Sequence, residues 1–108
     1  MNDVLPARAE KFAKDNPDIW KAYQELGKAC TEAGPLDGRT CRLVKLALAA
    51  AAGSVGGVHS HTRRAIAEGR SADELRHVAL LAVPTLGFAK AVATLTWIDD
   101  IVEGEGSG

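Results

Sequence analysis

The sequence has few cysteines, and their spacing excludes the commonest cysteine-based sites. Cys30 and Cys41 are the two cysteines of the 108-residue chain, and they lie eleven positions apart. This separation fits neither a Cys-x-x-Cys redox motif nor the paired spacing of zinc ligands. We therefore expect two buried, reduced thiols in different helices. We expect no structural disulfide, because cytosolic proteins rarely keep one.

The sequence also lacks an excess of charge and a long apolar run. Thirteen basic and fourteen acidic residues give a net charge of −1, without the basic footprint of a protein that binds nucleic acid or an anionic membrane. The stretch from Leu46 to His61 is uncharged, but it is rich in Ala and Gly and falls short of the roughly 20 apolar residues of a membrane span. Met1–Lys14 mixes charges and lacks the apolar core of a signal peptide. We expect a cytoplasmic protein with neither nucleic acid nor membrane as a partner.

Strand patterns are missing as well, and the chain reads as helices throughout. A hydrophobic content of 46% without excess Pro or Gly is typical of one folded domain. Asn16, followed by Pro17 and Asp18, predicts a capped helix start, and Asp37 predicts the next one. The first of these helices ends at Gly34-Pro35. The second has apolar residues around most of its circumference, so we expect it to be buried on most sides.

Further stop and start signals divide the second half of the chain. Gly69 ends a helix that contains two histidines, and Ser71-Ala72-Asp73-Glu74 is a capping box that opens the next helix. We expect that helix to end near Val83, because Pro84 follows. A last helix starts near Gly87, and a short one between Leu5 and Lys14 precedes them all.

The segment from Gly53 to Gly69 is the most informative part of the chain. A glycine-rich turn leads into the helix that carries His59 and His61. Free N–H groups and the positive end of the helix dipole lie beside Ser54 and Gly57, where they would hold an anion or activate a thiolate. Neither position is a cysteine. Taken alone, such a segment is more often a plain helix–helix connection.

The ordered motifs of the second part resemble the carboxymuconolactone decarboxylase family, which includes the alkylhydroperoxidase D-like proteins. The resemblance spans about Leu36 to Trp97. Its motifs are Leu36-Asp37-x-Arg39-Thr40, the glycine turn, His61 followed by Arg64-Ala65-Ile66-x-x-Gly69, Ser71-x-x-Glu74, and Pro84-x-x-Gly87-Phe88. It implies an all-α fold, a compact bundle of five to six helices over residues 1–103. The resemblance also implies symmetric homo-oligomers, commonly trimers or hexamers, with active sites near subunit contacts. The segment 104–108, Gly-Glu-Gly-Ser-Gly, has nothing to bury and is expected to be a flexible tail.

The resemblance to the peroxidase branch does not extend to its redox residues. That branch carries a Glu on the helix before the turn, then Cys-x-His-Cys, then a His four residues later. These positions correspond here to Arg42, Ser54, Gly56, Gly57 and His61, so only the last one matches. Because serine and glycine cannot take the oxidation states of sulfur, we disfavour a peroxiredoxin-type activity.

The decarboxylase branch does not need the cysteine pair and implies a catalytic role for His61. His61 is expected to move a proton near neutral pH, and Arg42, with Arg39 or Arg64, is expected to hold the carboxylate of a small organic acid or lactone. Ser54 and His59 are weaker substrate-binding candidates. His77 is expected at the surface. We expect no cofactor and no metal, since residues two apart on a helix point roughly 200° apart and His59 and His61 would not share an ion.

Two functional hypotheses stay open at this point. One is an enzyme, a decarboxylase-like lyase with acid–base chemistry, and the other is a non-catalytic oligomeric binding or regulatory protein. A single helical histidine is often an interface or core residue instead. A chain this small with broad apolar helix faces is expected to self-associate, whereas a monomer with some exposed apolar surface is the simpler alternative.

Overall fold

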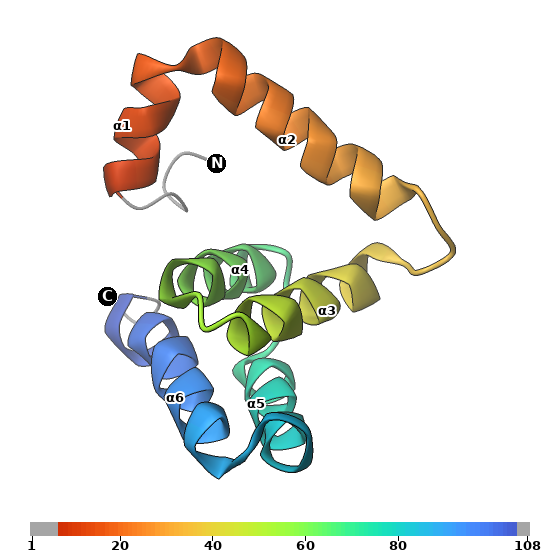
Figure 1. Ribbon diagram of the computed structural model, residues 1–108, viewed down its shortest axis with the longest axis vertical. Coiled ribbons are helices and arrows are strands. Elements are labelled where there is room, and N and C mark those ends of the chain that lie inside the picture. Colours follow the sequence, from red (N-terminus) through yellow and green to blue (C-terminus); the bar gives the residue numbers. More distant parts are fainter. Residues whose placement is uncertain (1–6, 106–108) are drawn as a thin grey trace. The chain divides into compact units, whose positions relative to one another are not determined.

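The computed structural model describes residues 7–105, which form helices and no strand (Figure 1). The expected all-α fold is therefore confirmed. Its elements are α1 (Ala7–Asp15), α2 (Pro17–Glu32), α3 (Gly38–Ala51), α4 (Val55–Ala67), α5 (Ala72–Leu86), α6 (Phe88–Asp99) and the π-helical turn η2 (Asp100–Glu105). The chain divides into two compact units at residues 41 and 42. The first contains α1, α2 and the first turn of α3. The second contains the rest of α3 and all later elements.

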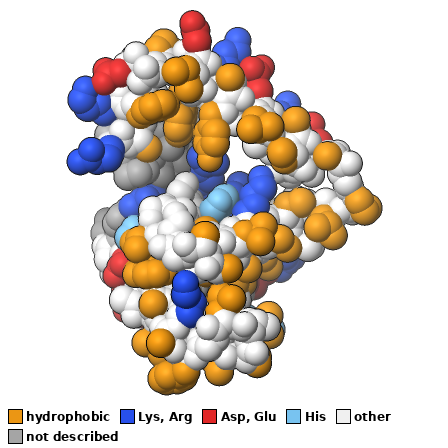
Figure 2. All heavy atoms as spheres, in the orientation of Figure 1, with side chains coloured by type: hydrophobic (Ala, Val, Ile, Leu, Met, Phe, Trp, Pro, Cys, Tyr) orange, Lys and Arg blue, Asp and Glu red, His pale blue; other side chains and the backbone are white. Residues whose placement is uncertain are grey.

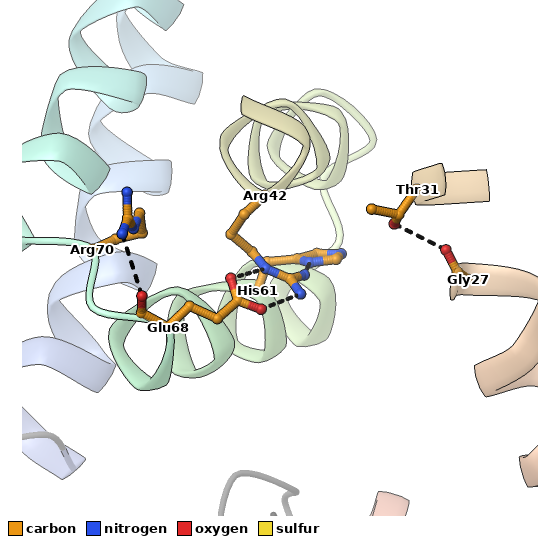
Figure 3. Close-up of polar contacts among 6 residues, drawn as sticks. All are labelled: Gly27, Thr31, Arg42, His61, Glu68 and Arg70. Atoms are coloured by element: carbon orange, nitrogen blue, oxygen red, sulfur yellow. Dashed lines mark hydrogen bonds and ion pairs between the residues drawn. The ribbon is translucent and has the colours of Figure 1, made fainter. Parts of the chain in front are cut away.

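In the first unit α1 and α2 meet at Asn16. Pro17 occupies the first helical position of α2 as predicted, but the Asn16 side chain makes no cap. Its Nδ2 donates instead to the carbonyl oxygen of Phe12 at 3.3 Å, because the chain arrives directly from α1 and offers that acceptor. The ring of Trp20 packs edge-on against Phe12 with centroids 6.3 Å apart. Farther along α2, the Thr31 hydroxyl donates to the carbonyl of Gly27 at 3.0 Å (Figure 3).

The two thiols differ from the expectation that both are buried. Cys30 on α2 is exposed, whereas Cys41 in the first turns of α3 is half-buried, and both are free thiols. The Cys41 Sγ lies 3.5 Å from the carbonyl oxygen of Leu36. The expectation fails for Cys30 because none of the residues of α2 is buried.

The core of the second unit is built by one or two small or branched residues from each helix. It consists of Leu46, Ala50, Val58, Ala65, Leu75, Ala79 and Ile98, which come from α3, α4, α5 and α6. On α3 only Leu46 and Ala50 are buried, while Val44 and Leu48 are 41% and 63% exposed. The prediction that this helix is buried on most sides is therefore wrong for the single chain.

Helix α5 begins as predicted and ends later than predicted. The capping box is complete, since Glu74 N–H donates to Ser71 Oγ at 3.1 Å and Ser71 N–H donates to Glu74 Oε1 at 2.9 Å. Pro84 does not end the helix, which continues to Leu86. The Pro84 ring is compatible with the φ angle of a helix and removes only one backbone N–H donor. Gly87 closes the last turn, because its N–H donates to the carbonyls of Ala82 and Val83 and its φ is +100°.

The described part of the chain ends in the π-helical turn η2, which sequence patterns did not indicate. Ile101 of this turn is buried within the second unit. Gly104 and Glu105, expected in a flexible tail, belong to the turn. The other tail residues, 106–108, lie outside the described part of the chain.

Apolar side chains remain exposed on the second unit. Figure 2 shows such side chains in orange where α5 runs into α6. Six large ones on these two helices are between 39% and 73% exposed: Leu80, Leu81, Val83, Leu86, Phe88 and Val92. Among the helices of residues 7–105, none combines the length and apolar character needed to cross a membrane.

Candidate functional site

The turn between α3 and α4 fixes the orientation of α4 relative to α3. Gly53 adopts a φ of +71°, which favours glycine, and its N–H donates to the carbonyl of Ala50 at 3.0 Å. The Ser54 hydroxyl caps α4 by accepting the Gly57 N–H at 3.0 Å. A Cβ on Gly57 would lie 2.8 Å from Ser54 Oγ and 3.0 Å from the Cβ of Ala49. The first turn of α4 is therefore packed directly against α3.

Across this packed junction Arg42 of α3 reaches His61 of α4 and Glu68, the C-cap residue directly after α4 (Figure 3). Its Nε and Nη2 donate to the two carboxylate oxygens of Glu68 at 3.0 and 2.8 Å. Its Nη1 lies 2.7 Å from Nδ1 of His61. All three groups belong to the second unit. The side chain of Arg42 is 13% exposed and that of Glu68 is 47% exposed, so the guanidinium is enclosed while the carboxylate reaches solvent.

The contact with Arg42 determines the tautomer of His61. A guanidinium has N–H donors and no acceptor, so Nδ1 of His61 must accept the hydrogen bond. A neutral imidazole that accepts at Nδ1 carries its proton on Nε2. The part of the ring directed away from Arg42 is therefore a hydrogen-bond donor and not a base.

The surroundings of His61 keep the ring neutral. Burial lowers the pKa of His61 from 6.5 to about 4, and the positive charges of Arg42, Arg64 and Lys45 act in the same direction. Only Glu68 opposes them. Hydrogen bonds from Arg42 in turn lower the pKa of the Glu68 carboxyl, so this group stays ionised. His61 thus titrates well below the neutral pH at which proton transfer was expected.

The other candidate residues have separate positions. Ser54 is the N-cap of α4. The Nε2 of His59 lies 3.0 Å from Oδ2 of Asp100 at the start of η2, so the two histidines point to different partners. Arg39 is exposed on the first turn of α3 in the first unit. His77 is exposed on α5, as predicted.

Glu68 is the residue of this cluster that sequence reasoning missed. It stands at an unspecified position of the motif Arg64-Ala65-Ile66-x-x-Gly69. Its spacing from His61 offered a signal, because residues seven apart lie on one face of a helix. The sequence could not indicate that Arg42, 26 positions earlier, is the partner of this carboxylate.

Comparison with known proteins agrees with the fold and with the order of the motifs. The family model described as "Carboxymuconolactone decarboxylase family" matches residues 17–100. The chain therefore belongs to the carboxymuconolactone decarboxylase family. No curated protein and no solved structure matches it.

Proposed function

We propose that this protein is a carboxymuconolactone decarboxylase-like lyase that acts on a small organic acid or lactone through His61. The observation that carries the proposal is the 2.7 Å contact between Arg42 Nη1 and His61 Nδ1, which leaves Nε2–H as a fixed donor. A neutral imidazole can stabilise negative charge that develops on a carbonyl oxygen without transferring its proton.

The reaction requires a carboxylate whose loss leaves an electron pair conjugated with the lactone carbonyl. The bond between that carbon and the carboxylate breaks, CO₂ leaves, and the electron pair moves into the carbonyl to give an enolate. His61 Nε2–H hydrogen-bonds the enolate oxygen, and a proton from water then adds to carbon. This role replaces the proton transfer near neutral pH that the sequence predicted for His61.

The acid itself is best held by Arg64. This residue lies three positions after His61 on α4, and its guanidinium makes no hydrogen bond or ion pair within residues 7–105. Its positive charge contributes to the lowered pKa of His61, which indicates that the two groups are close. Arg42 is less suited to this role because Glu68 and His61 already occupy its donors.

The protein is further proposed to act as a homo-oligomer, a trimer or hexamer, in the cytoplasm. The exposed apolar residues on α5 and α6 support self-association, and so does the family assignment. Leu80, 61% exposed, and Phe88, 73% exposed, are the most exposed large apolar residues of α5 and α6, and a partner subunit would cover them.

The function is tested with an unsaturated γ-lactone that carries such a carboxylate, by following release of CO₂. We expect turnover by the wild type, and a loss of about 100-fold or more in kcat/KM for His61→Ala, the usual effect of removing one oxyanion donor. His61→Gln should retain more activity, because its amide N–H can take the place of Nε2–H. His77→Gln, on the exposed face of α5, is the matched control and should match the wild type.

The alternative is a non-catalytic binding protein, which the low pKa of His61 also favours. This alternative predicts no CO₂ release, but shifts of the His61 ring signals in NMR spectra when a dicarboxylate such as succinate is added. A wild type with neither turnover nor such shifts contradicts both functions. If instead His61→Ala and His61→Gln both dissolve the oligomer, and no ligand effect exists in the wild type, His61 is an interface residue.

A further inference from the structure

We propose that Glu68 and Arg42 form a clamp that positions His61, so that Glu68 is a positioning residue of the site and Arg42 is not a ligand of the substrate acid. The clamp is defined as these two side chains and their three hydrogen bonds. The proposal rests on the proposed function in one respect only, that a ligand accepts a hydrogen bond from His61 Nε2–H.

The geometry of the guanidinium carries the first step of the argument. Its five N–H groups lie in one plane, so binding two of them fixes the direction of the others. Glu68 binds Nε and Nη2 in the bidentate manner, at 3.0 and 2.8 Å. The remaining nitrogen, Nη1, is thereby aimed at Nδ1 of His61. A lysine could form the ion pair, but it could not serve both partners with a rigid fork.

The placement of the residues along the chain carries the second step. Glu68 is the C-cap residue directly after α4 and lies seven positions after His61, so it continues the face of α4 that carries His61, about two turns farther along. Arg42 enters between them from α3 (Figure 3). Because α4 carries the imidazole and its C-cap residue carries the carboxylate, rotation of the guanidinium would break a contact with one of the two.

Burial and charge carry the third step. With 13% of its side chain exposed, Arg42 would be costly to leave unpaired, and Glu68 neutralises it. Arg64, whose positive charge also acts on His61, is the cation proposed above to hold the acid. The clamp therefore directs an anionic ligand toward Nε2 of His61 and away from Arg42.

The test uses NMR signals that do not depend on activity. In the wild type at pH 7 we expect His61 to show the Nε2–H tautomer with a hydrogen-bonded Nδ1, and the Arg42 Nε–H to exchange slowly with water. Glu68→Gln keeps the shape of the side chain and removes its charge. We expect this variant to lose the slow exchange of Arg42 and the hydrogen-bond shift of Nδ1, and to bind succinate at least fivefold more weakly.

Arg42→Lys tests the clamp from its other end and guards against misfolding of the first variant. It keeps the positive charge but lacks the fork, so it should also lose the Nδ1 shift. Asp73→Asn removes an exposed acid elsewhere on the second unit, 97% exposed on α5, and should leave the His61 signals unchanged.

Two outcomes would overturn the proposal. Unchanged His61 and Arg42 signals in Glu68→Gln would mean that Glu68 is an ordinary surface charge. Tighter binding of succinate by this variant would mean that Glu68 occupies the place of a ligand carboxylate on Arg42. A wild type that shows the clamp signals but neither turnover nor succinate binding would contradict the proposed function and leave the clamp intact.

Discussion

Acidification should destabilise this protein through His61. The pKa of His61 is about 4 in the folded protein, whereas that of an unperturbed histidine, as in the unfolded chain, is 6.5. Between these values the unfolded chain binds a proton that the folded chain does not bind. The stabilising effect is therefore complete above pH 6.5 and is lost as the pH falls toward 4.

The size of the effect follows from the shift and from the partial burial of the ring. A full shift of this size corresponds to about 3 kcal/mol. Because the ring is only half-buried and solvent screens part of the interaction, we expect about 2 kcal/mol between pH 7.5 and 4.5. This is a large part of the stability of a small domain.

Urea unfolding at fixed protein concentration measures this loss at both pH values. Wild type should lose about 2 kcal/mol more than His61→Gln, which cannot titrate in this range. Contributions from Glu68 and other carboxyls occur in both proteins and cancel in the comparison. His77→Gln controls for removal of an imidazole. Equal losses in wild type and His61→Gln would show that the fold does not keep His61 neutral, and would refute the tautomer argument as well.

Three further predictions concern the turn, the thiols and the assembly. Gly57→Ala should destabilise the fold by about 1–3 kcal/mol in thermal or urea unfolding, because its Cβ would lie 3.0 Å from that of Ala49, whereas Gly56→Ala, with open space around it, should be neutral or stabilising. The protein should not reduce alkyl or hydrogen peroxides above the background of free thiols. Turnover with a dithiol that disappears in Cys41→Ser would contradict this. Light scattering at micromolar concentration should give a multiple of the monomer mass, and Phe88→Asp should reduce it; a monomer mass for the wild type would be the contrary result.

The helix boundaries were predictable where local chemistry decides them. The capping box at Ser71 and the cap at Asp37, whose Oδ1 accepts the Thr40 N–H at 2.8 Å, depend on residues three positions apart. The side-chain cap predicted at Asn16 is wrong, because the preceding helix α1 supplies another acceptor for this side chain. The end of α5 predicted before Pro84 is wrong, because a proline near the end of a helix removes one hydrogen bond and the last turn tolerates this loss.

Burial and pairing were less predictable, since both depend on elements far apart in sequence. The apolar residues around α3 did not indicate which of its sides is buried: Leu46 and Ala50 are buried but Leu48 is 63% exposed, because apolar side chains do not identify the element that covers them. In the same way the sequence identified Arg42 and His61, and the structure brings them together. The contact of Arg42 with Glu68 could not be predicted, because the two residues are 26 positions apart.

The pattern of the peroxidase branch places a Glu where this chain has Arg42, and this difference changes the chemistry of the histidine. A carboxylate beside an imidazole favours its protonated form and would support the activation of a nearby thiol. Arg42 instead favours the neutral ring and holds its proton on the far nitrogen. The thiol positions are correspondingly filled by Ser54, which caps α4, and by Gly57, which has no room for a Cβ. These changes agree with one another, since a site without thiols has no use for a proton acceptor. Glu68 then neutralises the arginine, and the proposed site offers the Nε2–H donor of His61 in place of a proton acceptor.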